Sequence, residues 1–427
     1  MKLNKFCTKG LFCLFWTAAL LNGCGASQTT TPVNGGEAFT CSPNSLPNTL
    51  PATAPTGANV MPITVNGSLC TLGVNNEYQN EPCVSVTICV PGTSNCQTIG
   101  NILLDTGSYG LRVFSSLITV PLTPIASGSG TLAECVQFGD GSSEWGQVAT
   151  ADVQLGGETA SSVPIQLVNS TFSTPPAPCS STESTPDTSP TQAGFNGILG
   201  VGLLAQDCGS ECVQSTGLGQ YYACTGSSCP GTTVALKNQV VNPVAVLPVD
   251  NNGVILELPA VSANGAPSVT GSLVLGIGTE TNNIPTGVTA YGAANNATFM
   301  TEYDVNPSLT SFIDSGSNFY YIPPLASGFL PDCGGNASGI FCPASTVSLQ
   351  ALNMSASGST TSCVGFQVAN ADILNTGNMV YNNIAGDGGS GPQAFFDWGL
   401  PFFFGRSVYV GIEGKKSSLA TGPYWAY

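Results

Sequence analysis

The sequence predicts an all-β protein built from two lobes. Three observations support this prediction: the chain is 427 residues long, it contains 52 Gly and 30 Pro, and one short Asp-containing motif occurs once in each half. A chain of this length is expected to form more than one core. Frequent turn residues between short apolar runs favour strands over long helices. With 42% hydrophobic and only 7% charged residues, the composition is also unlike that of a disordered chain.

The N-terminus has the pattern of an export signal. Three lysines precede an apolar run, Leu11–Leu21, which is too short to span a bilayer. The run leads into Leu-Asn-Gly-Cys, which resembles the lipobox of bacterial lipoproteins; this implies cleavage after Gly23 and a lipid on Cys24. An ordinary secretory signal is the alternative. Because Gly rather than Asp follows Cys24, analogy with enterobacterial sorting gives no reason to expect retention at the inner membrane. We therefore expect a lipid-anchored protein of the bacterial cell envelope, at the outer membrane or the cell surface.

Cysteine usage agrees with export. Of the 17 cysteines, Cys7 and Cys13 lie in the signal and Cys24 is the expected anchor, which leaves an even number for disulfides in an oxidising compartment. Eleven of these lie at or before residue 229 and three lie after residue 330. Both groups are odd, so either one bridge crosses between the regions or one thiol pair stays free. Four cysteines are spaced as in a zinc site, although a disulfide-stapled loop suits an exported chain better: Cys208, Cys212, Cys224 and Cys229.

Changes in composition divide the chain into five parts. Residues 1–23 form the signal, and residues 24–58, rich in Thr, Pro, Ser and Gly, are expected to be a tether. Strand-like apolar runs fill residues 59–236, the predicted N-terminal lobe, and resume in residues 254–427, the predicted C-terminal lobe. Residues 237–253 would connect the two lobes.

Charge and the lack of histidine exclude several functions. Eight Lys and Arg stand against 24 Asp and Glu, so a nucleic-acid partner is not expected. The sequence contains no His, which removes Ser-His-Asp and Cys-His nucleophiles and every His-based metal site. If the protein is an enzyme, carboxylates are the groups left for acid–base chemistry. No cofactor and no metal are expected.

The repeated motif supplies two such carboxylates. In the first half, an apolar strand end, Ile102–Leu104, runs into Asp105, Thr106, Gly107 and Ser108; in the second half, Phe312–Ile313 runs into Asp314, Ser315, Gly316 and Ser317. Two carboxyl groups held close together cannot both ionise cheaply, so they share a proton. One can then activate a water while the other donates a hydrogen bond to a substrate carbonyl. Gly lets the two loops approach, and the hydroxyls of all four Thr and Ser residues are expected to donate to the carboxylates.

Together with further motifs in the same order, this pattern resembles the pepsin-like aspartic peptidases. The resemblance runs from about residue 60 to the end of the chain, as Val136–Ser142, Phe195–Gly202, Gly271–Gly276 and Gly399–Tyr409 resemble the family's flap, a segment behind the first catalytic loop, an early strand of the second lobe and the closing segment. It implies a bilobal fold with two six-stranded, barrel-like lobes and a central cleft. It also implies Asp105 and Asp314 as catalytic residues.

The chain departs from the family pattern around the flap. Phe138 stands where the family has a flap Tyr, and Arg112 stands where the family has the Trp that this Tyr contacts. The resemblance places Phe138, Gly139 and Arg112 on the substrate side. Two interpretations of Arg112 remain open, a contact with a flap acid, Asp140 or Glu144, and full solvation.

Two functions follow from the resemblance. The first is an aspartic endopeptidase that binds an extended peptide in the cleft and hydrolyses it, acting as a monomer. The second is a catalytically inactive, pepsin-fold lipoprotein that binds a peptide or an envelope partner. The intact motifs favour the first, and the altered flap favours the second.

Overall fold

The computed structural model describes residues 41, 50, 53–71, 78–374 and 377–427, and the architecture is almost entirely β. Two short α-helices are present among these residues, α1 (Pro190–Ala193) and α2 (Ser210–Gln214). No helix in this part of the chain is long and apolar enough to cross a membrane. The predicted all-β class is therefore confirmed. The expected signal and nearly all of the expected tether lie outside the described residues.

Hydrogen bonding joins the strands into two sheets of unequal size. The larger has 17 strands: β1 (Val60–Asn66), β2 (Glu81–Cys89), β3 (Cys96–Asp105), β4 (Tyr109–Phe114), β5 (Thr123–Pro124), β6 (Ala126–Ser127), β7 (Gly130–Gln137), β8 (Ser142–Leu155), β9 (Glu158–Val168), β10 (Thr185–Pro186), β11 (Gly197–Val201), β12 (Tyr221–Cys224), β13 (Gly253–Leu258), β14 (Val269–Leu275), β15 (Ala290–Gly292), β23 (Arg406–Gly411) and β24 (Tyr424–Ala426). The smaller has seven: β16 (Phe299–Tyr303), β17 (Asn306–Ile313), β18 (Tyr320–Ile322), β19 (Val347–Met354), β20 (Thr361–Val368), β21 (Ala385–Asp387) and β22 (Phe395–Trp398).

Short 3₁₀ turns connect many of these strands. They are η2 (Ser68–Cys70), η3 (Ser115–Leu117), η4 (Ala177–Cys179), η5 (Leu236–Asn238), η6 (Pro243–Val246), η7 (Gly335–Ala337), η8 (Ala371–Ile373), η9 (Gly391–Gln393) and η10 (Leu400–Phe403). Five of them have Pro or Asn at or next to the first turn, as expected for connections that end one strand and redirect the chain into the next.

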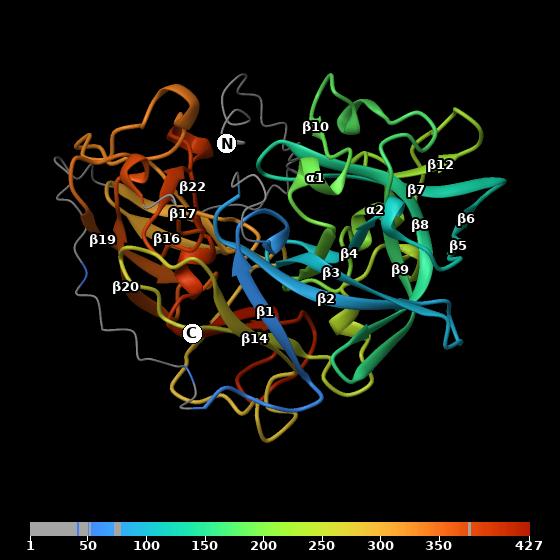
Figure 1. Ribbon diagram of the computed structural model, residues 1–427, viewed down its shortest axis with the longest axis horizontal. Helices are drawn as coiled ribbons and strands as arrows, with labels where there is room; N and C mark the ends of the chain where they lie inside the picture. The colour runs from blue at the N-terminus through green and yellow to red at the C-terminus, as the bar shows by residue number, and fades with distance from the viewer. Residues whose placement is uncertain (1–40, 42–49, 51–52, 72–77, 375–376) are drawn as a thin grey trace, which may run out of the picture.

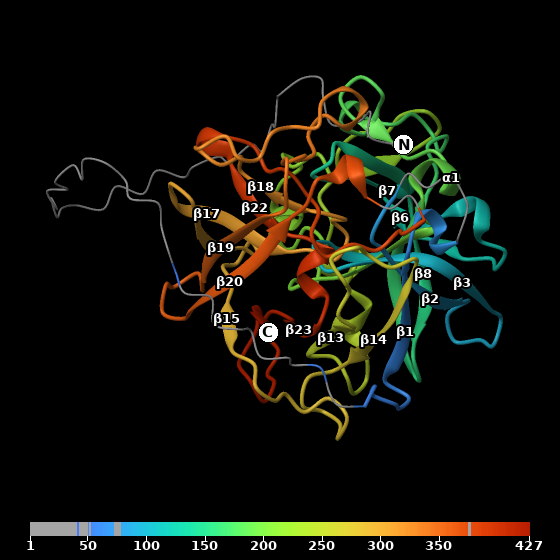
Figure 2. The same cartoon turned by 60° about the vertical axis from the view of Figure 1, so that its left-hand side comes forward.

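The larger sheet is continuous because strands from the second half of the chain join it. β1 pairs antiparallel with β14 over six residues, from Val60 opposite Val274 to Val65 opposite Val269. β13 in turn pairs with β14 and with β23. Figure 1 shows β1 and β14 side by side between the strands of the first half and the β16–β22 strands, and Figure 2 shows the same junction from the side. The two lobes therefore share one set of backbone hydrogen bonds.

The same local arrangement recurs in each lobe and positions the repeated motif. β3 ends at Asp105, and β11 lies parallel to it with Leu199 opposite Leu104. β17 ends one residue before Asp314, and β22 lies parallel to it with Trp398 opposite Ile313. The residue directly before each Asp, Leu104 or Ile313, is buried between neighbouring strands, so each Asp stands where its strand leaves the core.

Aromatic residues fill the core behind the second Asp. Phe396, Trp398, Phe402 and Phe403 have no exposed surface. The Trp398 ring lies 4.4 Å from that of Phe396 and packs edge-on against Tyr320, 5.9 Å away. Trp398 and its aromatic neighbours thus support the second Asp loop from behind.

The cysteines within the described residues form seven disulfides. One bridge, Cys41–Cys363, crosses between the two cysteine groups, as one of the expected alternatives required. The cysteines that are spaced as in a zinc site form two local bridges, Cys208–Cys212 and Cys224–Cys229. The other four bridges are Cys70–Cys83, Cys89–Cys96, Cys135–Cys179 and Cys333–Cys342.

Candidate active site

The two Asp loops have matching hydrogen bonds. The Gly107 N–H donates to Asp105 Oδ1 over 2.7 Å, and the Ser108 hydroxyl donates to Asp105 Oδ2 over 2.5 Å. In the second loop, the Gly316 N–H donates to Asp314 Oδ1 over 2.8 Å, and the Ser317 hydroxyl donates to Asp314 Oδ2, also over 2.8 Å. Each carboxyl group therefore has both oxygens held by its own loop.

The other two hydroxyls of the motif have a different role from the one expected. The Thr106 hydroxyl donates to the Ile313 carbonyl and accepts the Ser315 N–H, each over 2.9 Å. Reciprocally, the Ser315 hydroxyl donates to the Leu104 carbonyl over 2.7 Å and accepts the Thr106 N–H over 3.1 Å. The expectation that these two hydroxyls donate to the carboxylates was wrong. They bridge the lobes because each lies beside unpaired backbone groups at the end of the partner strand.

The two glycines leave room for the opposite carboxyl group. A Cβ atom placed on Gly107 would lie 2.6 Å from Asp314 Cγ, and one placed on Gly316 would lie 2.7 Å from Asp105 Cγ. Non-bonded carbon atoms do not approach this closely, so any side chain at either position would push the two loops apart. Gly at these positions is required by the close approach of the loops.

The two carboxyl groups form one electrostatic unit. Asp105 is buried, and its carboxyl group is hydrogen-bonded to that of Asp314. Burial raises the pKa of Asp314 well above its ordinary value, and the neighbouring Asp105 raises that pKa further. The Ser317 hydroxyl and the Gly316 N–H act in the opposite direction. The geometry thus brings together the two acids predicted from the sequence and favours a proton on Asp314.

The fold class expected from the resemblance, a bilobal pepsin-like arrangement with one Asp loop from each lobe at the centre, is confirmed by this geometry.

The flap hairpin is formed by β7, β8 and the turn Phe138–Gly141. Asp140 Oδ1 accepts the N–H and the hydroxyl of Ser142, which fixes the turn. The Phe138 ring is partly buried and packs against the apolar cluster that contains Leu103 and Ile198, whereas Gly139 is exposed. The charge of Asp140 raises the pKa values of Tyr78 and Tyr321, after the larger effect of burial. The charge of Asp314 also raises the pKa values of both tyrosines.

Arg112 lies beneath the flap. Its side chain is 1% exposed, so the solvated interpretation was wrong. Arg112 Nη2 lies 2.9 Å from Glu134 Oε1 on β7 and 3.0 Å from Asp207 Oδ2. Arg112 therefore forms its ion pairs with Glu134 and Asp207 and not with the expected flap acids, Asp140 and Glu144. Burial lowers the pKa of Arg112, but Glu134 and Asp207 outweigh that effect and keep the guanidinium charged. This residue therefore supports the flap from inside and does not line an exposed surface.

Two functional positions were missed by sequence reasoning. The Tyr78 hydroxyl donates to the Gly316 carbonyl over 2.8 Å. Asn80, which has no exposed surface, donates to the carbonyls of Asn318 and Tyr381 and accepts the Tyr381 N–H. Both residues lie just before β2, and their hydrogen bonds connect the first half of the chain to the second Asp loop and its neighbours. No motif marks them, because isolated Tyr and Asn residues in a connection carry no spacing signal.

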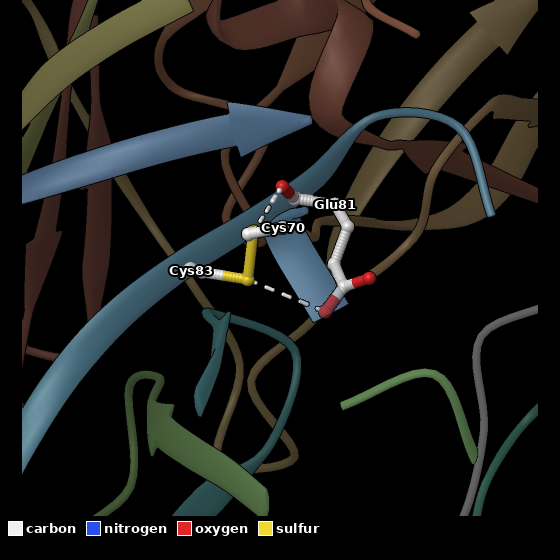
Figure 3. A group of neighbouring side chains, drawn as sticks. All are labelled: Cys70, Glu81 and Cys83. Carbon is white, nitrogen blue, oxygen red and sulfur yellow. Dashed lines mark hydrogen bonds between the residues drawn. A yellow bond between two sulfur atoms is a disulfide. The ribbon is translucent and has the colours of Figure 1, made fainter. Parts of the chain in front are cut away.

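Among the described residues, few side chains are grouped in a way that could bind a metal ion. Two groups of three candidate ligands occur, and in each the two cysteines are joined in a disulfide, which leaves one carboxylate. Figure 3 shows one such group, with a Glu81 carboxylate oxygen 3.3 Å from the Cys83 sulfur. A single carboxylate beside a disulfide does not form a metal site. Cys24, the expected lipidation site, lies outside the described residues.

A scan against family models matches residues 55–427 to the family described as "Protein of unknown function (DUF3443)". The chain belongs to the DUF3443 family. The matched region of this DUF3443 chain contains both Asp loops, the flap and a cysteine-rich stretch, residues 204–233. A search of curated protein sequences finds no match. A search of solved structures finds an aspartic proteinase from Irpex lacteus at 18% sequence identity, covering 86% of this DUF3443 chain and 96% of that chain with a TM-score of 0.49.

Proposed function

We propose that this DUF3443 protein is an exported, lipid-anchored aspartic endopeptidase. It hydrolyses peptide bonds of extended peptide or protein substrates with Asp105, Asp314 and one water molecule, as a monomer and without a cofactor. The observation that carries this proposal is the pair of facing carboxyl groups, hydrogen-bonded to each other and each held by two donors from its own loop. Carboxyl pairs in such an arrangement share one proton, which supplies an acid and a base at the same place.

The unequal environments of the two acids suggest their roles. The raised pKa of Asp314 favours a proton on this residue, so Asp314 donates a hydrogen bond to the substrate carbonyl. Asp105, as the ionised partner, takes a proton from the water. The water oxygen attacks the carbonyl carbon while the Asp314 proton passes to the carbonyl oxygen, which gives a tetrahedral diol. When the diol collapses, one of its hydroxyls returns a proton to Asp314, and the proton that Asp105 took from the water passes to the leaving nitrogen as the C–N bond breaks. No covalent enzyme intermediate is needed.

Activity depends on pH through the shared proton. As pH rises through the upper apparent pKa of the pair, the last proton is lost and the substrate carbonyl loses its donor. As pH falls through the lower one, the base is protonated. A bell-shaped profile is therefore expected, with its alkaline limb extended by the raised pKa of Asp314.

The surroundings of the pair suit a peptide substrate. The flap turn carries exposed Gly139 next to partly buried Phe138. Beyond the second Asp loop, a small pocket opens between Gln79 and Phe319, with Ile340 and Ile384 in its wall. In our proposal, the flap binds the substrate backbone and this pocket takes an apolar side chain.

Hydrolysis of a broad peptide library from about pH 3 to about pH 7 tests the proposal. Asp105→Asn and Asp314→Asn are each expected to lower kcat at least about a thousandfold, because neither amide can take its part in proton transfer. The matched control is Asp387→Asn, which changes an exposed Asp of the same lobe and should leave the rate unchanged. A statine-type mimic of the tetrahedral diol should inhibit the wild type. Full activity in either dyad variant would contradict the assignment.

The alternative is a binding module without turnover. Arg112 and Phe138, which replace the family's flap pair, are the observations in its favour. Saturable peptide binding without any product, by folded and disulfide-intact protein over the whole pH range, would establish this alternative.

Export and lipid attachment are proposed from the N-terminal motif alone. Mass spectrometry of the mature protein is expected to find an N-terminal Cys24 that carries acyl groups, with residues 1–23 absent. Cys24→Ala should abolish acylation and release the protein from the membrane fraction. An unmodified mature chain starting elsewhere would favour the ordinary secretory signal.

A further inference from the structure

A third carboxyl group lies beside the Asp pair. Asp397, on β22, is 2% exposed. The next residue, Trp398, accepts the Asp314 N–H at its carbonyl over 3.1 Å. Asp397 is thus held by the strand that supports the second Asp loop. Among the described residues, its Oδ1 atom has no hydrogen-bond partner. An ionised carboxylate that is buried without a full set of hydrogen bonds destabilises the folded protein, whereas the protonated form does so much less.

The fold itself does not require an acid at this place. In the first lobe, β11 lies parallel to β3 with Ile198 opposite Leu103, two residues before Asp105. In the second lobe, β22 lies parallel to β17 with Asp397 opposite Phe312, two residues before Asp314. The two lobes therefore put Ile198 and Asp397 at equivalent positions. Ile198 is buried as part of an apolar cluster, so an apolar residue meets the structural need.

Asp397 contacts the second Asp loop through a hydroxyl. The Ser317 hydroxyl lies within reach of the Asp397 carboxyl group and lowers the pKa of that acid by hydrogen bonding, and the same hydroxyl donates to Asp314 Oδ2 over 2.8 Å. A Ser hydroxyl has one proton to donate and can accept at its oxygen. When Ser317 donates to Asp314, a hydrogen bond to Asp397 therefore requires that Asp397 carry the proton. In the first loop, Ser108 has Asp105 as its carboxyl partner and Ile198 at the equivalent strand position.

The electrostatic surroundings favour that protonated form. Burial raises the pKa of Asp397 well above its ordinary value, the charge of Asp314 raises it further, the Ser317 hydrogen bond lowers it and Asp105 raises it. Tyr321, paired with Asp397 across β18 and β22, is a further titratable group beside it, and the charge of Asp397 raises its pKa.

We propose that Asp397 is a third acid of the site, which in its protonated form donates a hydrogen bond to Ser317 and thereby fixes the direction of the Ser317 hydrogen bond to Asp314. It is a positioning residue, because it acts on Asp314 through Ser317 and does not touch the substrate. The inference rests on the proposed peptidase function for its kinetic consequences, but the arrangement of protons can be tested without activity.

Ionisation of Asp397 would have two effects on Asp314. The Asp397 carboxylate would compete for the single Ser317 proton, and it would place a second negative charge beside Asp314. Both effects disfavour the ionised form of Asp314. Asp397 therefore makes the second Asp loop respond to pH in a way that the first, with Ile198, does not.

Kinetics of the full-length protein test the positioning role. Asp397→Ile, which copies the first lobe, is expected to lower kcat about tenfold with little change in KM, because the hydrogen bond matters most when charge develops on Asp314. Asp397→Asn should recover most of that loss, since its amide also donates to Ser317. Its alkaline limb should move to lower pH, because no charge at position 397 then opposes loss of the last proton.

The link through Ser317 is tested by double variants. In a Ser317→Ala background, Asp397→Ile should have no further effect on kcat; in a Ser108→Ala background, the tenfold loss should persist. Unchanged kcat in Asp397→Ile, or an equal loss in both backgrounds, would overturn the proposal.

Carbon-13 NMR of Asp side chains separates this inference from the proposed function. In protein labelled at Asp Cγ, the Asp397 signal, assigned from Asp397→Asn, should titrate well above the ordinary range. It should shift in Ser317→Ala and Asp314→Asn but not in Ser108→Ala. These results are expected whether or not peptides are cleaved. An Asp397 signal that titrates in the ordinary range, or that ignores Ser317→Ala, would overturn the inference even in an active enzyme.

Discussion

At the scale of single residues, the most unusual feature is the number of buried acids. Glu134, Glu144 and Asp207 lie near one buried cation, Arg112. Glu134 and Asp207 bind the guanidinium directly. Among the described residues, neither carboxyl oxygen of Glu144 has a hydrogen-bond partner. A single cation cannot compensate three buried charges, so at least one of these acids is expected to be neutral in the folded protein.

Burial favours the neutral form of both Asp207 and Glu144, and the proton on Glu144 makes stability depend on pH. Burial raises the pKa of Glu144 to about 8; Arg112 opposes the shift, and Asp187, Glu134 and Asp105 add to it. The folded protein thus retains a proton that the unfolded chain loses near pH 4.5. Between these values the unfolded state binds fewer protons, so the free energy of unfolding falls as pH rises, by up to about 1.4 kcal/mol per pH unit from this group.

Denaturant unfolding between about pH 5 and about pH 8 measures this effect. Glu144→Gln is expected to flatten the pH dependence by as much as one proton, because Gln has a similar shape and no charge. The control Glu183→Gln removes an exposed acid and should keep the wild-type slope. An unchanged slope in Glu144→Gln would mean that Glu144 is ionised in the folded protein.

The functional residues that could be predicted from the sequence are those that lie within a short, recognisable motif. Asp105 and Asp314 were predicted because each follows an apolar strand end within a repeated four-residue motif. The roles of Thr106 and Ser315 were not, because their partners are backbone groups of the other lobe. Arg112 was placed on the wrong side of the flap for a related reason: its partner Asp207 is far away in sequence. Spacing within one segment carries no information about such contacts.

At the scale of elements, composition predicted that the chain forms strands, but it did not predict how the strands pair into sheets. Alternating apolar residues and Gly-rich turns indicated the strands. The pairing of β1 with β14, in contrast, depends on which edge of each sheet remains open once the lobes fold. The resemblance implied two separate six-stranded barrels, whereas hydrogen bonds join 17 strands into one sheet that contains parts of both halves.

The cysteine-rich stretch, residues 204–233, contacts the flap. Asp207 and Tyr221 lie within it, and the Tyr221 hydroxyl donates to Asp207 Oδ1 over 2.7 Å. β12 of the same stretch pairs with flap strand β7, with Tyr221 opposite Glu134. The bridge Cys135–Cys179 also ties β7 to η4. The cysteine-rich stretch is therefore part of the support of the flap and restricts how far β7 can move.

At the scale of the whole molecule, contacts of several kinds join the two lobes. β1 pairs with β14 over six residues. Thr106 and Ser315 exchange hydrogen bonds with the opposite Asp loops. Asn80 binds the backbone of the second half through its side chain. If either lobe unfolded alone, backbone groups of the other lobe would lose their hydrogen-bond partners, which would raise the free energy of the partly unfolded state.

This connection predicts that the disulfide-intact protein unfolds in a single transition. Calorimetry should give a calorimetric enthalpy close to the van't Hoff enthalpy, although chains with two lobes often unfold in steps. Thr106→Val removes the cross-lobe hydroxyl and should lower the free energy of unfolding by about 1–3 kcal/mol, because it leaves the Ile313 carbonyl and the Ser315 N–H without that partner. The whole transition should move to lower temperature without splitting. Thr98→Val, which removes an exposed hydroxyl within the first lobe, should move it little. Two separate transitions in the wild type, or a shift confined to part of the transition in Thr106→Val, would show that each lobe is stable without the contacts at the Asp pair.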